Sequence, residues 1–174
     1  MKRLLLLILA AIMILSTARS QENPKVVSDV NLNRYAGTWY EIARLPNPFE
    51  RKLKCITATY TLRADGRITV LNKGHYITNP AKVNSVTGVA WVPDKNVPAK
   101  LKVQFFWPFS GNYWILLLDK DYKYVLIGDP SYKYLWILCR EKKMDELTYN
   151  MLLNKATENG FEIKPIIRVD QDCN

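Results

Sequence analysis

Apolar and polar residues alternate with a period of two along most of the chain after residue 36. Segments with this period are separated by turn signals from Gly37 to Arg140, a spacing that is typical of a β-sandwich or β-barrel. The pattern predicts eight strands, at residues 37–45, 55–62, 67–72, 83–92, 100–107, 113–118, 122–128 and 134–140.

The connections between these strands are short. Asp65-Gly66 and Gly111-Asn112 are hairpin signals, and Asn79-Pro80 and Pro93-Asp94 indicate loops. Short connections favour antiparallel pairing of neighbouring strands, and closing such a sheet removes its exposed edges. The predicted fold is therefore all-β, an eight-stranded antiparallel up-and-down β-barrel, which is wide enough to hold one small ligand.

The alternation gives way to helical spacing near residue 144. Asn159-Gly160 then supplies a C-terminal stop. We expect one α-helix packed on the outside of the barrel, followed by a short ninth strand within residues 161–169, where Pro165 favours an edge position. The apolar residues that carry the helical spacing are Met144, Leu147, Met151, Leu152 and Ala156.

The N-terminal segment does not fit the barrel pattern. Two basic residues precede an apolar run at residues 4–15, and the small residues Ala18 and Ser20 provide a cleavage signal. The run is shorter than the about 20 residues that a membrane-spanning helix needs. We therefore predict a signal peptide at residues 1–20 and a single domain at 21–174.

Charge and composition narrow the function classes. The formal net charge is +9, and removing Lys2, Arg3 and Arg19 with the signal peptide lowers it to +9 − 3 = +6. The single His argues against most His-dependent hydrolases and zinc enzymes, and no zinc-ligand spacing or nucleic-acid-binding motif is present. We expect no metal, no cofactor and no nucleic-acid partner, and export to a compartment where disulfides persist.

Strand periodicity also predicts which residues face inward. In the strand at 100–107 the polar residues alternate with Leu101 and Val103, which we expect inside, and the small residues Gly88 and Ala90 would leave room for a ligand. The residues that we predict to contact a ligand are Ala43, Phe49, Tyr60, Tyr76, Gly88, Ala90, Leu101, Val103, Phe105 and Tyr113.

Residues 31–44 resemble the first signature of the lipocalin family, in which a short helical turn leads into a strand through Gly37-x-Trp39. The similarity extends through residues 57–60, 126–130 and 134–140 and is closest to the bacterial outer-membrane and apolipoprotein D branches. It implies the same barrel, with a cavity for a small hydrophobic ligand. The family's second signature, Thr-Asp-Tyr, is only partly present within residues 118–122.

The resemblance also assigns structural roles at the base of the barrel. In the family an Arg at the position of Arg140 packs over the Trp at the position of Trp39, which belongs to the Gly37-x-Trp39 signature, and closes the base of the barrel. Such a cation–π contact contributes roughly 0.5–2 kcal/mol. The resemblance therefore implies structural, not catalytic, roles for these three residues.

The three cysteines fit the same resemblance. Cys55 and Cys173 match positions that form a disulfide in the apolipoprotein D branch, and such a bridge would fasten the C-terminal tail to the barrel wall. Cys139 is left over. We interpret it as a buried, inert thiol, with a reactive thiol as the alternative.

Four connections share the end of the barrel opposite Trp39 and form its mouth, at residues 46–54, 73–82, 108–112 and 129–133. Aromatic residues gather at 105–114, which suggests either a lipid-contacting rim or core packing. Basic residues near the mouth could attract an anionic head group or membrane surface, or could simply be solvated; they are Arg51, Lys52, Lys54, Lys73 and Lys82.

Glu41 is an unusual residue for the interior of a barrel. If Trp39 faces inward, period 2 also places Glu41 and Ala43 inward. A buried carboxylate must be paired or neutral. Glu41 is therefore either a partner in a structural ion pair or a group that orients a polar part of a ligand.

The function predicted from these features is that of an exported carrier, not an enzyme, that binds small amphiphiles such as fatty acids or lysophospholipids. It would be periplasmic or associated with the outer membrane in a bacterium and secreted otherwise, with peripheral membrane contact through the aromatic and basic mouth. No cysteine for a lipid anchor lies near the cleavage point. The alternatives are an enzyme that uses Cys139 as nucleophile or His75 as base, and a surface-interaction protein whose pocket is filled.

Overall fold

The computed structural model describes residues 22–173, so the predicted signal peptide lies outside the described residues. The elements, in chain order, are α2 (Leu32–Tyr35), β1 (Gly37–Arg44), β2 (Leu53–Leu62), β3 (Ile68–Tyr76), β4 (Asn79–Trp91), β5 (Lys100–Phe106), β6 (Phe109–Leu118), β7 (Tyr124–Gly128), β8 (Leu135–Cys139), α3 (Glu146–Glu158) and β9 (Ile167–Arg168).

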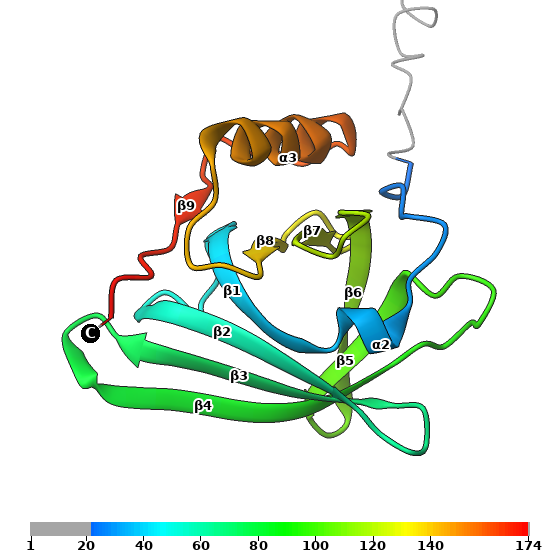
Figure 1. Ribbon diagram of the computed structural model, residues 1–174, viewed down its shortest axis with the longest axis horizontal. Helices are drawn as coiled ribbons and strands as arrows, with labels where there is room; N and C mark the ends of the chain where they lie inside the picture. The colour runs from blue at the N-terminus through cyan, green and yellow to red at the C-terminus, as the bar shows by residue number, and fades with distance from the viewer. Residues whose placement is uncertain (1–21, 174) are drawn as a thin grey trace, which may run out of the picture.

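Strands β1 to β8 form a closed antiparallel barrel (Figure 1), which confirms the predicted fold class. Each strand pairs with its neighbour in the chain, and the ring closes where β1 pairs with β8 as well as with β2. Helix α3 lies outside the ring, and β9 pairs with β1, also outside the ring. No helix in the described residues is long and apolar enough to cross a membrane.

Two hairpins differ from the prediction. The β3–β4 ladder continues to the pair Tyr76 and Asn79, so Asn79-Pro80 begins a strand where we predicted a loop. The β5–β6 ladder likewise continues past the pair Val103 and Gly111, so Gly111-Asn112 lies inside a strand. The turn is formed instead at Trp107-Pro108, where proline has no N–H to offer a ladder.

The ninth strand is shorter than the 161–169 segment predicted for it, because Ile166 N–H donates to Ile163 O, 3.0 Å away, in a turn around Pro165. Only Ile167–Arg168 pairs with β1. The strand does lie at an edge, as the proline indicated.

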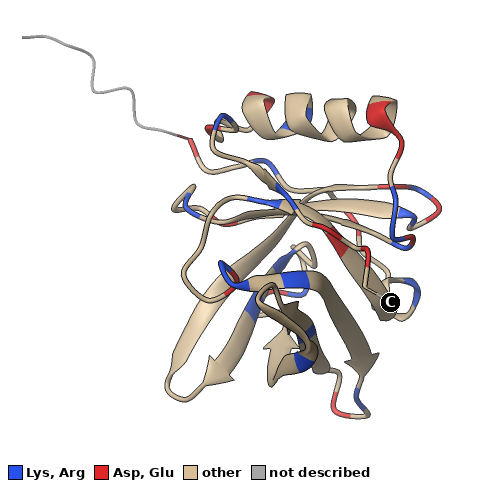
Figure 2. Ribbon diagram, turned by 90° about the vertical axis from the view of Figure 1, so that its left-hand side faces the viewer, with Lys and Arg blue, Asp and Glu red and all other residues tan. Residues whose placement is uncertain are grey.

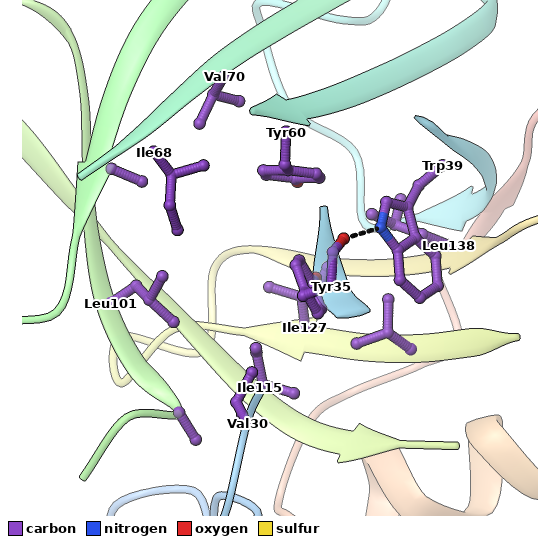
Figure 3. Packing of buried hydrophobic residues seen from close by; sticks show 13 residues of the cluster. Val30, Tyr35, Trp39, Tyr60, Ile68, Val70, Leu101, Ile115, Ile127 and Leu138 are labelled. Carbon is purple, nitrogen blue, oxygen red and sulfur yellow. Dashed lines mark hydrogen bonds between the residues drawn. The ribbon is translucent and has the colours of Figure 1, made fainter. Parts of the chain in front are cut away.

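An apolar core around Trp39 fills the end of the barrel next to α2 (Figure 3). Trp39 is completely buried, and its Nε1 donates to Tyr35 O at 2.9 Å, which ties β1 to α2. Asn31 caps the N-terminus of α2, and its side chain accepts hydrogen bonds from the backbone amides of Asn33 and Arg34. This core closes one end of the barrel.

Arg140, just after β8, covers that closed end. Its guanidinium carbon lies 3.9 Å from the centre of the Trp39 ring. Nη2 donates to the carbonyls of residues 34, 35 and 36, and Nη1 donates to Thr38 O at 2.9 Å. Gly37 has φ +97°, and a Cβ there would lie 3.2 Å from Nη1. The cation–π contact that the resemblance implied is therefore present.

Helix α3 packs against the outer face of the barrel with a second apolar cluster. Tyr149, Leu152 and Ala156 are buried there, and Asp145 caps the helix by accepting from Thr148 N at 2.9 Å. The helical spacing included Leu147, but this side chain is 85% exposed and points away from the barrel.

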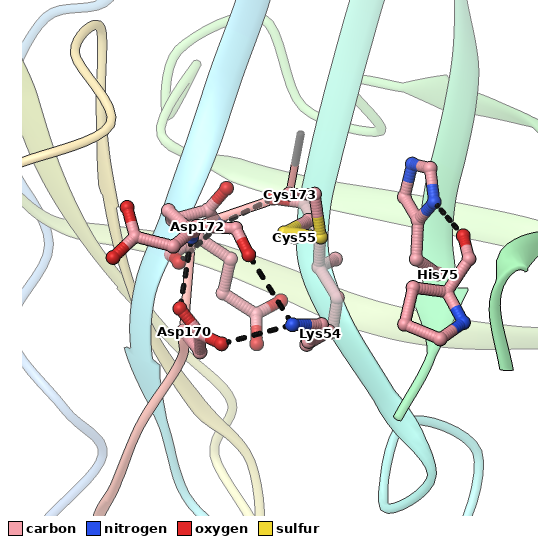
Figure 4. The surroundings of a disulfide bond; sticks show 10 residues. Lys54, Cys55, His75, Asp170, Asp172 and Cys173 are labelled. Atoms are coloured by element: carbon pink, nitrogen blue, oxygen red, sulfur yellow. Dashed lines mark hydrogen bonds and ion pairs between the residues drawn. A yellow bond between two sulfur atoms is a disulfide. The ribbon is translucent and has the colours of Figure 1, made fainter. Parts of the chain in front are cut away.

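The C-terminal tail is fastened to the barrel wall by the Cys55–Cys173 disulfide (Figure 4), which the resemblance implied. Gln171 is buried, and its Nε2 donates to Glu41 O and Ile56 O at 2.7 and 3.0 Å. Lys54 Nζ pairs with Asp170 at 3.2 Å. The tail therefore covers the junction of β1 and β2.

Candidate ligand-binding cavity

The barrel encloses a cavity of about 600 Å³ that lies above the Trp39 core and opens toward the β1–β2, β5–β6 and β7–β8 connections. This volume lies within the range of about 300–1,000 Å³ that is usual for small-molecule sites. The wall consists mainly of aliphatic and aromatic side chains from most of the eight strands, among them Ile56, Ile68, Val70, Val86, Leu101, Val103, Ile127 and Leu138.

Most of the side chains that we predicted to contact a ligand lie in this wall. They are Phe49, Tyr60, Ala90, Leu101, Val103, Phe105 and Tyr113. The simple alternation of β5 therefore places its side chains correctly. Ala43, Tyr76 and Gly88 do not line the cavity, and each has a local reason.

Ala43 faces outward because β1 has an irregularity. The pairing of β1 with β8 shifts register between Glu41 and Ala43, and such a bulge reverses the alternation that follows it. Ala43 is completely buried, but in the cluster beneath α3. Arg44 is buried with its guanidinium against Glu41.

The space beside Gly88 is filled by another side chain of the protein. A Cβ at Gly88 would lie 2.6 Å from the Phe105 ring, so the glycine makes room for this side chain and not for a ligand. Tyr76 follows a register shift after His75 and lies beneath Lys82, whose Nζ is 5.1 Å from the ring centre. Tyr76 is thus outside the cavity.

Three tyrosine hydroxyls form the polar floor of the cavity. Tyr113 Oη lies 2.6 Å from Tyr35 Oη and 2.8 Å from Tyr60 Oη. Burial raises the pKa of all three hydroxyls, so the floor is uncharged at neutral pH. Three O–H groups share two contacts, which leaves the floor able to donate one further hydrogen bond.

A buried charged cluster lies in the cavity wall, closer to the mouth than the tyrosine hydroxyls. Arg44 Nη1 donates to Glu41 Oε1 at 2.8 Å, and Arg44 Nη2 donates to Glu50 O at 2.9 Å. Arg44 Nε lies 3.8 Å from Glu50 Oε2. Each of the three side chains is at least nine-tenths buried. One guanidinium therefore serves two carboxylates.

Glu50 is held in place by further donors. Trp136 Nε1 donates to Glu50 Oε2 at 3.1 Å, and Asn47 Nδ2 donates to the same oxygen. Burial raises the pKa of Glu41 well above its usual value, the nearby Glu50 carboxylate raises it further, and Arg44 opposes both effects. Glu41 thus tends to hold a proton, whereas the carboxylate of Glu50 accepts two hydrogen bonds, from Trp136 and Asn47.

The sequence pattern identifies Glu41 but not its partners. Nothing in the pattern distinguishes Arg44 and Glu50 from other charged residues of the signature and the loop, or Trp136 from other residues of its strand. Their association depends on the bulge in β1 and on the path of the β1–β2 connection, and neither leaves a periodic signal.

The basic residues expected at the mouth do not line the cavity. Arg51 and Lys52 are exposed in the β1–β2 connection, and Lys54 pairs with Asp170 of the tail. Figure 2 shows Lys and Arg residues spread over many strands and loops, not gathered at one end. The described residues therefore provide no cationic seat for a head group inside the barrel.

Large aromatic side chains project from the mouth into solvent. Phe106, Trp107 and Phe109 at the β5–β6 turn are 72%, 86% and 76% exposed, and Phe49 in the β1–β2 connection is 56% exposed. Phe49, Phe106 and Phe109 also line the cavity entrance. The tip aromatics are thus a rim around the opening and not core residues.

The two residues of the enzyme hypothesis lie apart from the cavity. Burial raises the pKa of the Cys139 thiol, which opposes thiolate formation. His75 lies on the outside of the barrel near the disulfide, with Nδ1 2.6 Å from Pro80 O (Figure 4). Residues 22–173 hold no cluster of three or more residues that could ligate a metal.

Comparison with known proteins agrees with this architecture. A family model described as a lipocalin-like domain matches residues 30–171. Temperature-induced lipocalin-1 from Arabidopsis thaliana is 43% identical over 84% of this chain and 82% of its own length. Outer membrane lipoprotein Blc from Citrobacter freundii shows the same identity and coverage, and apolipoprotein D from Macaca fascicularis is 35% identical over 99% of this chain and 97% of its own length.

Solved structures show the same fold at lower identity. Insecticyanin from the tobacco hornworm Manduca sexta superposes with a TM-score of 0.68 at 24% identity, over 86% of this chain and 85% of the other. Apocrustacyanin C1 superposes with a TM-score of 0.68 at 16% identity, over 87% and 92%. With the barrel, the Gly37-x-Trp39 signature and the Arg140 contact, these matches establish that the chain belongs to the lipocalin family.

Proposed function

We propose that this protein is an exported lipocalin that binds and carries or stores small amphiphiles, a class that includes fatty acids and lysophospholipids. The observation that carries the proposal is the apolar cavity of about 600 Å³, open at one end and closed at the other by the Trp39 core. Membership of the lipocalin family supports binding of a small hydrophobic ligand in the barrel.

The physical basis of binding is burial of the acyl chain. Each CH₂ removed from water contributes about 0.8 kcal/mol, so eleven methylenes contribute about 9 kcal/mol before the costs of association. Ile68, Val70 and Leu101 offer the chain an apolar wall in the depth of the barrel. The polar end of the ligand then lies nearer the mouth.

The rim supports a peripheral contact with membranes. Trp107 and its aromatic neighbours are exposed beside the entrance, and Arg51 and Lys52 lie next to Phe49 in an adjacent connection. Aromatic side chains favour the membrane interface, and basic residues are attracted to anionic lipids. A barrel that rests on a bilayer by its mouth could take up an amphiphile without exposing the acyl chain to water.

The relatives bear on the location of the protein. Blc is named an outer membrane lipoprotein, and the apolar segment at residues 4–15 is consistent with export of this chain as well. We therefore propose that this protein is exported and contacts membranes through the rim.

The test is a binding titration of the delipidated protein with N-phenyl-1-naphthylamine, an uncharged fluorescent probe, and its displacement by lysophosphatidylcholine. We expect saturable binding with one site at micromolar concentrations. The matched variants Ala90→Trp and Val103→Trp fill the cavity and should abolish binding while unfolding at temperatures close to that of the wild type. Absence of saturable binding to the wild type would favour the hypothesis of a filled pocket.

A further inference from the structure

The charged side chains that face the cavity are all acidic. Three carboxylate residues line it, Glu41, Glu50 and Asp129, whereas no Lys, Arg or His of the described residues does. Glu41 and Glu50 are 3% and 8% exposed. Any charged head group that enters the barrel therefore meets negative or neutral side chains first.

Arg44 does not reverse this bias. Its Nη1 is used by Glu41 Oε1 and its Nη2 by Glu50 O, and Arg44 does not line the cavity, although both carboxylate side chains do. The single guanidinium faces two carboxyl groups and can pair with the charge of only one of them. Its Nε is buried without a hydrogen-bond partner in the described structure, but Arg44 is not part of the cavity wall, so the guanidinium lies behind the two acids and does not face a ligand.

Another hydrogen-bond acceptor in the cavity wall, on β3, has no hydrogen-bond partner. Asn72 lines the cavity from β3, and its Oδ1 is buried without a hydrogen bond in the described structure. Asn72 pairs with Ala58 of β2, and Ala58 pairs with Trp39 of β1, two residues before Glu41. The unpartnered oxygen and the Glu41 carboxylate therefore lie on the inner faces of nearby strands. Buried acceptors of this kind are usually satisfied by a donor, which points to a donor on the ligand.

We propose that the cavity prefers single-chain amphiphiles whose head group is cationic or a neutral hydrogen-bond donor, held by Glu41, Glu50 and Asn72, over those with a free carboxylate. This inference rests on the proposed function and specifies its ligand class. It narrows the class above, because it ranks an ammonium or polyol head group ahead of a fatty acid.

The physical reason is the cost of burying charge. An ammonium group beside Glu41 and Glu50 exchanges its hydration for charge-assisted hydrogen bonds, and a polyol can donate to the same carboxylates and to Asn72 Oδ1. A carboxylate in the same place loses its hydration and finds no Lys, Arg or His among the described residues of the cavity wall to pair with. The net positive charge of the protein resides on its outer surface, where solvent and salt screen it.

The test compares three ligands with twelve-carbon chains by displacement of N-phenyl-1-naphthylamine, below their micellar concentrations, at neutral pH. Dodecylamine is cationic, 1-monolauroylglycerol is a neutral donor, and laurate is anionic. We expect the amine and the glyceride to displace the probe at concentrations at least tenfold lower than laurate. Equal or tighter binding of laurate in the wild type would overturn the inference.

Variants test which cavity residues are responsible for the preference among head groups. Glu41→Gln and Glu50→Gln should each weaken dodecylamine binding at least fivefold and leave laurate unchanged or improved, and Asn72→Leu should weaken the glyceride. Glu141→Gln, an exposed acid outside the cavity, should match the wild type. Affinities for dodecylamine and the glyceride that are the same in all three cavity variants as in the wild type contradict the inference. Failure of the probe itself to bind contradicts the proposed function instead, so the two failures are distinguishable.

Discussion

Arg140 is the residue on which most contacts at the closed end of the barrel converge. Its guanidinium packs on Trp39 and donates to backbone carbonyls from α2 to the start of β1, and its Nε donates to Tyr122 O at 3.3 Å. These carbonyls have no strand partner on that side. The planar fork of Arg suits several such acceptors at once, whereas the ammonium of Lys cannot reach all of them.

We predict that Arg140→Ala lowers the free energy of unfolding by about 2–4 kcal/mol, because a cation–π contact and several charge-assisted hydrogen bonds are lost together. Arg140→Lys should restore less than half of this loss. Urea unfolding followed by tryptophan fluorescence measures both. The exposed Lys142→Ala is the control, and a loss in Arg140→Ala no larger than in this control would contradict the structural role.

Glu41 should make stability depend on pH in a defined direction. Its pKa is raised in the folded protein by burial and then by Glu50, so the folded state binds its proton more tightly than the unfolded state does. Stability from this group is greatest below the unfolded pKa of about 4.3 and is lost as pH rises toward the folded pKa.

The variant Glu41→Gln keeps an acceptor for Arg44 but cannot ionise. We predict that the melting temperature of the variant relative to the wild type rises between pH 4 and pH 8, which differential scanning calorimetry can follow. A difference that stays constant over this range, or that falls, would show that folding does not raise the pKa of Glu41 and would contradict the prediction.

At the scale of elements, the sequence predicts strands well where the alternation is unbroken. Leu101, Val103 and Phe105 alternate with polar residues, and all three line the cavity. The bulge in β1 is invisible because Ile42 and Ala43 are both apolar, so either could face inward. A ladder that continues through Gly111-Asn112 likewise overrides a local hairpin signal.

The β5–β6 turn should act as a membrane contact. Trp107→Ser and Phe109→Ser should each weaken binding to vesicles of phosphatidylcholine and phosphatidylglycerol about tenfold, since a buried aromatic side chain contributes about 1.5–3 kcal/mol. Leu147→Ser is the matched control, because Leu147 is equally exposed but lies on α3, away from the mouth. Vesicle co-sedimentation measures the effect, and equal losses in Leu147→Ser would assign it to general hydrophobicity.

At the scale of the whole molecule, the disulfide joins Cys55 in β2 to Cys173 in the C-terminal tail, 118 residues further along the chain. Two further contacts join the tail to the barrel. They are the hydrogen bond from Gln171 Nε2 to Glu41 O and the ion pair of Asp170 with Lys54. In the chain-entropy model a bridge over so long a loop contributes about 4–5 kcal/mol. The bridge therefore stabilises the closed barrel more than any other single contact of the tail.

We predict that the double variant Cys55→Ala/Cys173→Ala unfolds with a free energy about 2–5 kcal/mol below that of the wild type. Treatment of the wild type with dithiothreitol should produce a similar loss, whereas the double variant should not respond. A response of the double variant to dithiothreitol would contradict this assignment, because the remaining Cys139 can form only an intermolecular disulfide.

The barrel, its closed base and the tail bridge could all be anticipated from sequence or from family resemblance, because they depend on periodicity and on a few signature residues such as Trp39. The charge distribution of the cavity could not. It arises from the bulge that buries Arg44 and from the connection that brings Glu50 against it. Such contacts between unlike elements carry no periodic signal.

The central claim is that the barrel carries a single-chain amphiphile, and native mass spectrometry of the protein isolated without detergent or delipidation tests it most directly. We predict a one-to-one complex whose bound mass is that of a single-chain lipid, absent from the Ala90→Trp variant isolated in the same way. A wild-type protein that carries no ligand, or a lipid bound equally by the cavity-filled variant, would contradict the claim.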